Sequence, residues 1–259
     1  MVALCIAAAI AFGVKLVQEA GGGRPQSVDS LSTAVAELPG SARPAFRVGH
    51  PVLLDRTESR ARFAPVLRSV EARATPRPDA GTVATVATQT PEGTTNIVLV
   101  LGEVSRRNGA WVHVRLPVLP NDRTGWLLRS ALGGYRFVHT RLIVDRRRLT
   151  ATLLRDGRQV FSATVGVGRP NWPTPAGEFY IRNKVSGFND PFYGPVAFGT
   201  SARSAVLTDW PGGGFVGIHG TNAPELIPGR ISHGCIRMRN VDILRLARLM
   251  PVGTPLTIR

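Results

Sequence analysis

The stretch "ISHGCIRMRN", residues 231–240, places Cys235 directly after a histidine and a glycine. The other cysteine of the chain, Cys5, lies at its N-terminal end. A single cysteine in the main part of a chain that also contains histidines is a candidate nucleophile. Gly234 permits a sharp turn in which the N–H groups of residues 233–235 point at one spot. The stretch therefore favours a nucleophilic thiol, with a buried structural thiol as the alternative.

A partner for this thiol occurs in "GIHGTN", residues 217–222, where His219 ends an apolar strand pattern. Sixteen positions separate His219 from Cys235, and the intervening prolines and glycine allow the chain to loop back. A free thiol has a pKa of about 8.5, and an adjacent imidazole can take its proton and form a thiolate–imidazolium pair. A zinc site of His219, His233 and Cys235 is the alternative, although a fourth ligand and the usual ligand spacings are missing.

Together, "IHGTN" and "SHGCIRMRN" resemble the signature of the L,D-transpeptidase catalytic domain. The segment from Val165 to Ile181, with "VGVG" and "PTPAGEFYI", resembles a second part of that family, the strand, turn and strand that precede its site. The resemblance covers about residues 138–259. It implies a peptidoglycan enzyme that attacks stem tetrapeptides, releases D-Ala and holds the acyl group as a thioester on Cys235.

The resemblance also assigns roles to individual residues. Cys235 matches the nucleophile and His219 the general base, and the main-chain carbonyl of Gly220 orients the imidazole. The oxyanion donors it implies are the N–H groups of His233, Gly234 and Cys235. Residues expected to contact or support the substrate are Arg237, Ser232, Phe192, Tyr193 and Asn240. An arginine fork suits substrate carboxylates, whereas Asn240 serves equally well as the cap of a helix.

The acceptor of the acyl group remains open. The amine of a second stem, carried by a diamino acid such as meso-diaminopimelate, would give a 3→3 cross-link. Water would make the enzyme an L,D-carboxypeptidase, and a wall lipoprotein would make it an attachment enzyme. Family resemblance further implies that carbapenems acylate the cysteine. No metal or cofactor is expected.

The fold class indicated is mainly β: a sandwich-type catalytic domain over residues 135–259, preceded by a small β-barrel. Residues 66–134 contain short strand patterns between turns and resemble a bacterial SH3-like domain. Asp156-Gly157 lies between two alternating strands and predicts a hairpin. The segment "VDILRLARLM" predicts one helix, capped by Asn240 and apolar on the side of Val241, Leu244 and Leu249.

Residues 1–20 begin with an apolar run and are expected to be an export signal or short membrane anchor, and 21–65 a linker or unassigned segment. These features predict an extracytoplasmic protein of the cell wall. The family resemblance implies peptidoglycan stem peptides as partners, and the net charge of +15 allows anionic wall polymers or a membrane surface as further ones. No zinc finger or RNA-binding aromatic run supports a nucleic-acid partner.

A non-catalytic wall-binding protein is the competing class, in which the SH3-like segment would do the binding. The intact pair of His219 and Cys235 argues against it. The remaining histidines, His50, His113 and His139, are expected to be structural or at the surface. Trp111 and Trp126 are expected in the core or groove of the barrel. Trp172 and Trp210 could line the cleft or pack in the core.

Overall fold

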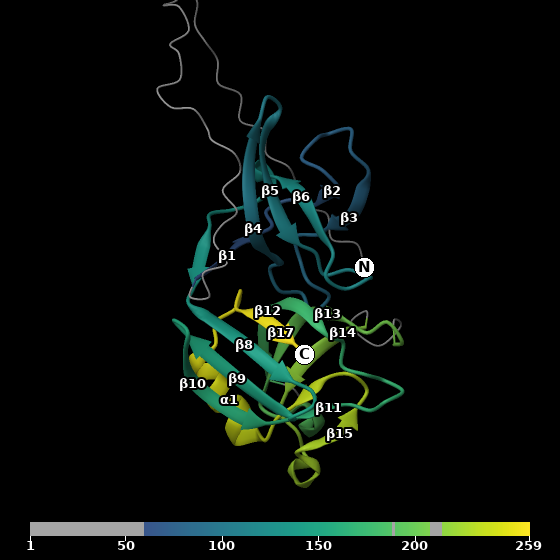
Figure 1. Ribbon diagram of the computed structural model, residues 1–259, viewed down its shortest axis with the longest axis vertical. Coiled ribbons are helices and arrows are strands. Elements are labelled where there is room, and N and C mark those ends of the chain that lie inside the picture. Colours follow the sequence, from purple (N-terminus) through teal and green to yellow (C-terminus); the bar gives the residue numbers. More distant parts are fainter. Residues whose placement is uncertain (1–59, 188–189, 208–213) are drawn as a thin grey trace, which may run out of the picture. The chain divides into compact units, whose positions relative to one another are not determined.

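The structure is a computed structural model that describes residues 60–187, 190–207 and 214–259 (Figure 1). The predicted export signal, the linker up to residue 59, His50 and Trp210 lie outside these residues. Within the described ranges, no helix is both long and apolar enough to span a membrane.

The first sheet has seven strands in the order β3-β2-β6-β5-β4-β1-β7, and every pairing in it is antiparallel. Val98, Val112 and Leu127 are among the residues of its apolar core. The sheet includes residues on both sides of the predicted range 66–134. Strand β1 (Ala61–Pro65) precedes that range, β7 (Arg136–Val138) follows it, and the two strands pair with each other. Its SH3-like character stays a prediction. Its elements are β1 (Ala61–Pro65), β2 (Val70–Arg73), β3 (Thr82–Val86), β4 (Ile97–Arg106), β5 (Gly109–Arg115), β6 (Thr124–Leu128), the 3₁₀ turn η1 (Arg129–Ala131) and β7 (Arg136–Val138).

The second sheet has ten strands in the order β10-β9-β8-β17-β12-β13-β14-β16-β11-β15. The C-terminal strand β17 lies in its middle, parallel to β8 and antiparallel to β12, so the chain end completes the sheet. The expectation of a mainly β fold is confirmed. Its elements are β8 (Thr140–Asp145), β9 (Thr150–Arg155), β10 (Arg158–Thr164), β11 (Gly166–Gly168), β12 (Gly177–Ser186), η2 (Pro191–Tyr193), β13 (Val196–Arg203), β14 (Phe215–His219), η3 (Pro224–Leu226), β15 (Gly229–Ser232), β16 (Ile236–Arg237) and β17 (Pro255–Ile258).

The hairpin between β9 and β10 turns at Asp156-Gly157, as the sequence predicts. Both residues have positive φ, 49° and 75°, which is the backbone that a tight two-residue hairpin requires.

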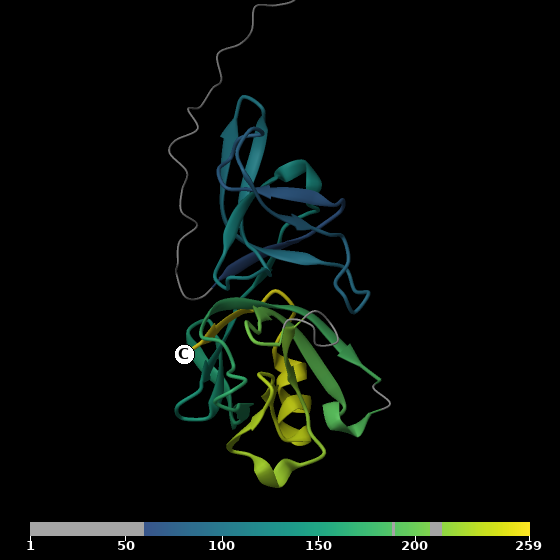
Figure 2. The same cartoon turned by 90° about the vertical axis from the view of Figure 1, so that its right-hand side faces the viewer.

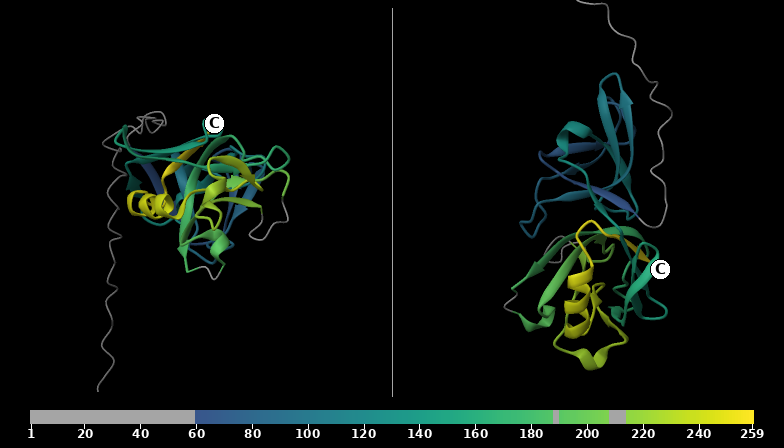
Figure 3. Two further views of the ribbon diagram at one scale, coloured as in Figure 1. Left: turned by 90° about the horizontal axis from the view of Figure 1, so that it is seen from below. Right: turned by 90° about the vertical axis from the view of Figure 1, so that its left-hand side faces the viewer.

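The helix α1 (Asn240–Leu249) is also confirmed, but its predicted cap and apolar face are wrong. Arg239 occupies the N-cap position and no side chain caps the helix. Val241 and Leu244 are exposed, whereas Ile243 and Leu246 are buried in the core of the ten-stranded sheet. The sheet curves around this helix, so that β8–β10 and β12–β14 lie on opposite sides of it (Figures 2 and 3).

The structure places four of the tryptophans and histidines outside the site for which the sequence predicts a structural or surface position. Trp111 is buried, and Trp126 stacks on His113 with ring centroids 4.7 Å apart. His139 lies at the surface, where its Nδ1 is 2.8 Å from an Asp156 carboxylate oxygen. These four residues therefore have the structural and surface positions expected of them.

Candidate active site

Cys235 follows the turn between β15 and β16, at the point where β16 runs parallel to β14. The backbone N–H of Gly217, on β14, donates to the Cys235 Sγ at 3.4 Å. Gly217 has no side chain, and a Cβ there would lie 3.9 Å from this sulfur and 4.0 Å from Cδ2 of His219. The structure thus brings the thiol and the imidazole to the same glycine, so the two residues of the predicted Cys–His pair lie in one pocket.

His219 is the last residue of β14 and is only 2% exposed. Its Nδ1 lies 2.7 Å from the carbonyl oxygen of Gly220. A carbonyl can only accept, so Nδ1 carries the proton and Nε2 has a free lone pair. The imidazole is therefore held in the tautomer that can accept a proton from a thiol, and the carbonyl of Gly220 does what the sequence predicts for it.

The electrostatic environment keeps both groups neutral at rest. Burial lowers the pKa of His219 to about 4, more than its hydrogen bond to Gly220 raises it. Burial also raises the pKa of the Cys235 thiol, and the Gly217 N–H and the Arg237 charge offset only part of that effect. Burial thus disfavours a preformed thiolate–imidazolium pair in this pocket.

The turn before Cys235 is held by Ser232. Its hydroxyl donates to the carbonyl oxygen of Cys235 at 2.5 Å and accepts from the N–H of Gly234 at 3.1 Å. Gly234 has a φ of 119°, in the region where other residues are strained. Because the Gly234 N–H is engaged by Ser232, the predicted oxyanion donors are reduced to the N–H groups of His233 and Cys235. Ser232 supports the turn and is itself almost fully buried.

Thr174 is a member of this site that the sequence analysis missed. Its buried hydroxyl donates to the carbonyl oxygen of Gly234 at 2.8 Å and accepts from the N–H of Gly168 at 2.9 Å. It thereby ties the catalytic turn to the end of β11. Thr174 lies in the segment "PTPAGEFYI", whose resemblance to the L,D-transpeptidase family was noted from the sequence. That resemblance assigned no role to any side chain of the segment.

Arg237 points into the same pocket from β16 and is only 7% exposed. Its guanidinium carbon lies 4.3 Å from the centre of the Phe192 ring. The Nε atom is buried without a hydrogen-bond partner among the described residues. Burial also lowers the pKa of Arg237, although it stays far above neutral. An anionic ligand would satisfy this charge.

Phe192 and Tyr193 lie on the short turn η2, whose start is capped by Asp190 accepting from the N–H of Phe192 at 2.8 Å. Their ring centres lie 5.8 and 5.2 Å from that of His219. The two aromatic side chains predicted to be near the substrate therefore do line the pocket beside the imidazole.

Asn240 does not line the pocket. Its side-chain oxygen accepts the N–H of Thr221 at 2.9 Å. A Cβ on Gly194 or Gly220 would collide with that oxygen, so both glycines allow the amide to sit against the backbone. The expected substrate contact at Asn240 is therefore replaced by a contact that fixes the backbone just after His219.

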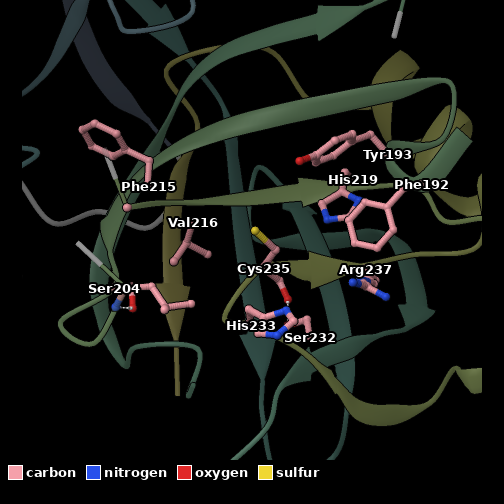
Figure 4. A pocket seen from close by; sticks show the side chains of 12 residues that line it. Phe192, Tyr193, Ser204, Phe215, Val216, His219, Ser232, His233, Cys235 and Arg237 are labelled. Atoms are coloured by element: carbon pink, nitrogen blue, oxygen red, sulfur yellow. Dashed lines mark hydrogen bonds between the residues drawn. The ribbon is translucent and has the colours of Figure 1, made fainter. Parts of the chain in front are cut away.

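The pocket as a whole has an open volume of about 450 Å³. Figure 4 shows His219, Arg237 and the two aromatic rings on one side of Cys235, and the apolar Val216 and Phe215 on the other. Trp172 packs on His233 with ring centres 4.5 Å apart. No group of three or more His, Cys, Asp or Glu side chains in the described ranges is placed to hold a metal ion. The lining residues are Phe192, Tyr193, Ser204, Leu207, Gly214, Phe215, Val216, His219, Ser232, His233, Cys235 and Arg237.

The described residues thus define a mainly β protein with a thiol–imidazole pocket at the ends of two parallel strands. Residues 139–258 match the family model of the YkuD L,D-transpeptidase catalytic domain. YqjB of Bacillus subtilis is 31% identical over 125 residues, which are 45% of this chain and 69% of YqjB. The chain belongs to the YkuD family of L,D-transpeptidase catalytic domains.

Two further proteins are similar to the C-terminal part of this chain. YkuD of Bacillus subtilis, like YqjB provisionally named an L,D-transpeptidase, is 38% identical over 109 residues, 42% of this chain and 59% of YkuD. The chain therefore spans less than two thirds of that relative. The catalytic domain of an Enterococcus faecium L,D-transpeptidase, solved by NMR, is 30% identical, with 46% of this chain and 96% of that one covered and a TM-score of 0.34.

Proposed function

We propose that this protein is a peptidoglycan L,D-transpeptidase that forms 3→3 cross-links between stem peptides through a Cys235 thioester. The observation that carries the proposal is that the Cys235 sulfur and the His219 ring both lie within about 4 Å of the point where a Gly217 Cβ would be, with Nδ1 of His219 bonded to the Gly220 carbonyl. A nucleophile and a base in this arrangement, with the base oriented by a third group, suit acyl transfer.

The first half of the reaction transfers the acyl group to the enzyme. The thiol proton passes to Nε2 of His219 as Sγ forms a bond with the carbonyl carbon of the third residue of the donor stem. In this proposal the N–H groups of His233 and Cys235 donate to the resulting oxyanion. When the carbon–nitrogen bond breaks, His219 returns the proton to the nitrogen, and D-Ala leaves as a free amine.

The second half of the reaction transfers the acyl group from Cys235 to the amine nitrogen of the acceptor, by the same steps in reverse. The amine of a second stem attacks the thioester carbon and gives a proton to His219. The carbon–sulfur bond breaks, and Sγ leaves with the proton from His219 as a thiol. Water in place of the amine would yield an L,D-carboxypeptidase, which is the alternative reaction. A wall lipoprotein as acceptor would use the same chemistry.

The substrate also bears on where the protein acts. Because stem peptides belong to the cell wall, we propose an extracytoplasmic location, with an exported or membrane-anchored chain. The net charge of +15 supports an added attraction to anionic wall polymers or to a membrane surface. In the competing proposal of a non-catalytic wall-binding protein, the pair of His219 and Cys235 would have no use.

Intact mass of the protein after incubation with a carbapenem tests the acyl-transfer step. We expect a one-to-one adduct in the wild type and none in Cys235→Ala. A folded, reduced wild-type protein that forms no adduct would sink the proposal in favour of the wall-binding class. Purified muropeptides then identify the acceptor: cross-linked dimers indicate transpeptidation, and tripeptides alone indicate the carboxypeptidase.

A further inference from the structure

Glu92 connects the first sheet to strand β12 of the ten-stranded sheet. It lies in the loop between β3 and β4, and both of its carboxylate oxygens have partners on β12. Its Oε1 accepts from the Arg182 guanidinium at 3.3 Å, and its Oε2 accepts from the Asn183 amide at 3.0 Å. Partial burial raises the pKa of Glu92, but the Arg182 charge and the hydrogen bonds lower it by more. The loop therefore brings a negative charge to β12 at neutral pH.

Arg182 connects this carboxylate to the active-site pocket. Its side chain is 1% exposed, and its Nε donates to the carbonyl oxygen of Thr200 at 2.8 Å. Its guanidinium carbon lies 3.7 Å from the centre of the Phe215 ring, which lines the pocket. An arginine stays charged, and a buried charge is costly unless a partner is supplied. Without Glu92, the guanidinium would have to move toward water and away from the ring.

A second arginine over Phe215 is also held from the first sheet. The guanidinium carbon of Arg203 is 4.9 Å from the ring centre. Its backbone N–H donates to Oδ1 of Asn121 at 3.0 Å, and its carbonyl oxygen accepts from the Asn121 amide at 2.8 Å. Asn121 lies in the loop between β5 and β6. Two separate loops of the first sheet therefore bind arginines that pack on the same aromatic ring.

Phe215 stands on the pocket face of β14. Alternate residues of a strand project to one face and are about 6.6 Å apart, so Phe215, Gly217 and His219 share a face. The sulfur of Cys235 lies next to the bare glycine, 3.9 Å from where its Cβ would be. Figure 4 shows His219 on one side of Cys235 and Phe215 on the other. The imidazole and the phenyl ring therefore border opposite sides of the nucleophile.

The proposed reaction assigns a part of the substrate to each side. The carbon that Sγ attacks has three other groups: the oxygen, the nitrogen that leaves and the acyl chain. The oxygen is directed to the N–H groups of the turn, and the nitrogen to His219, which returns its proton. The acyl chain, which is the rest of the donor stem, extends to the remaining side. There the pocket is lined by the apolar Phe215 and Val216.

We propose that Glu92 positions Phe215 through Arg182, and that the first sheet thereby shapes the side of the pocket that receives the acyl chain of the donor stem. The inference rests on the proposed acyl-transfer function. It adds a determinant of donor binding that lies outside residues 139–258, the range that matches the family model. Glu92 and Arg182 are positioning residues, and Phe215 contacts the donor.

The test compares a large and a small reagent for the same thiol, in the whole chain. The large one is a stem tetrapeptide, whose release of D-Ala gives kcat and KM. The small one is iodoacetamide, which alkylates Cys235 without filling the acyl side. The variants are Glu92→Ala, Glu92→Gln and, as a matched control, Glu71→Ala. Glu71 also pairs with an arginine, but its bonds to Arg73 and Thr82 stay within the first sheet.

In Glu92→Ala we expect KM for the tetrapeptide to rise by roughly 3- to 10-fold, the cost of one packed aromatic contact, with little change in kcat. Glu92→Gln keeps an oxygen that accepts from Arg182 and should lie between the alanine variant and wild type. Glu71→Ala should match wild type. Alkylation by iodoacetamide should be equal in all four proteins, because the thiol and His219 keep their places. A merely structural loss would slow both reactions together.

Double-mutant cycles show whether the effect of Glu92 passes through the ring. Phe215→Ala should itself raise KM, and adding Glu92→Ala should raise it no further. A second cycle uses Arg182→Met, in which an apolar side chain packs on Phe215 and needs no counter-charge. In that background Glu92→Ala should have no effect. If Arg182→Met fails to fold, the cycle with Phe215→Ala still decides.

An unchanged KM in Glu92→Ala, or a further rise when it is added to Phe215→Ala, would overturn the inference and leave the enzyme standing. A wild type that neither releases D-Ala nor forms the carbapenem adduct would instead remove the proposed function. The positioning is then read by NMR from the ring signals of carbon-13-labelled phenylalanine, assigned with Phe215→Leu. These signals should shift in Glu92→Ala and not in Glu71→Ala, and unchanged signals would overturn the positioning as well.

Discussion

The Nδ1 atom of His219 lies 2.7 Å from the carbonyl oxygen of Gly220, the residue that follows it in the chain. In many other catalytic sites a carboxylate accepts the hydrogen bond that fixes the tautomer of the histidine. Here a backbone carbonyl accepts it from Nδ1 of His219 and adds no charge. Among the residues that the structure describes, no negative charge raises the pKa of His219, and burial together with the Arg237 charge lowers it. Burial therefore favours the neutral forms of both the His219 ring and the Cys235 thiol.

Replacing His219 by alanine should slow acylation of Cys235 by a carbapenem by roughly 100- to 10,000-fold, the usual range for a general base. Stopped-flow or mass-resolved kinetics would measure the rate, and thermal unfolding would show that the fold remains. His233→Ala is the matched comparison from the same pocket. If His233→Ala abolished acylation while His219→Ala did not, the base would be wrongly assigned.

The low pKa of His219 should also make stability depend on pH. In the unfolded chain this histidine binds a proton below about pH 6.5, whereas in the folded protein it stays neutral down to about pH 4. Acidification between these values therefore favours the unfolded state. The free energy of unfolding should lose about 2–3 kcal/mol from this group between pH 7 and pH 4.5, with the full contribution present above pH 6.5.

Urea unfolding of wild type and His219→Gln at pH 7, 5.5 and 4.5 would measure this loss. The glutamine amide can still donate to the Gly220 carbonyl but does not titrate. The free energy of unfolding is plotted against pH for both proteins, and the difference between the two slopes is the contribution of His219. The acidic groups titrate in both proteins and therefore cancel. Identical pH slopes for the two proteins would show that the ring is not held neutral by burial.

That Cys235 and His219 lie in one pocket, beside a turn at Gly234, could be predicted because each of the two segments has a recognisable local pattern. Cys235, His233 and Gly234 are neighbours in sequence, and His219 ends a strand whose apolar pattern is visible. The hairpin at Asp156-Gly157 is local in the same way. The mainly β class follows from many such short patterns.

The features that the sequence analysis missed or misread depend on contacts between distant residues. Thr174 meets Gly234 across 60 positions, and Asn240 meets Thr221 across 19. The amide of Asn240 is compatible with a helix cap or a pocket contact until the loop after His219 is placed against it. The pairing of β1 with β7 carries the first sheet to both sides of residues 66–134, and such a pairing between distant segments leaves no local pattern in the sequence.

Thr174→Val should remove one hydroxyl that serves two backbone groups while nearly preserving the side-chain volume. The carbonyl of Gly234 and the N–H of Gly168 would then be buried without their partner, at a cost of about 1–3 kcal/mol. We expect a lower melting temperature and roughly 10-fold slower acylation, since the donors of the turn lose their orientation. Thr174→Ser keeps the hydroxyl and should restore most of the rate. A valine variant with wild-type acylation would show that the hydroxyl does not position the turn.

Asn240 offers the last test, because its side-chain oxygen fixes the N–H of Thr221 directly after the carbonyl that orients His219. In Asn240→Ala this backbone can relax, so the Nδ1 hydrogen bond weakens and acylation should slow by roughly 10-fold, the cost of about one hydrogen bond. Asn240→Asp retains the accepting oxygen and places a negative charge in the first turn of α1, where helices tolerate it. It should therefore keep a near-wild-type rate. The His219 ring N–H, observed by nitrogen-15 NMR, should exchange with water faster in the alanine variant alone. Equal exchange in all three proteins would mean that the Gly220 carbonyl holds its place without Asn240.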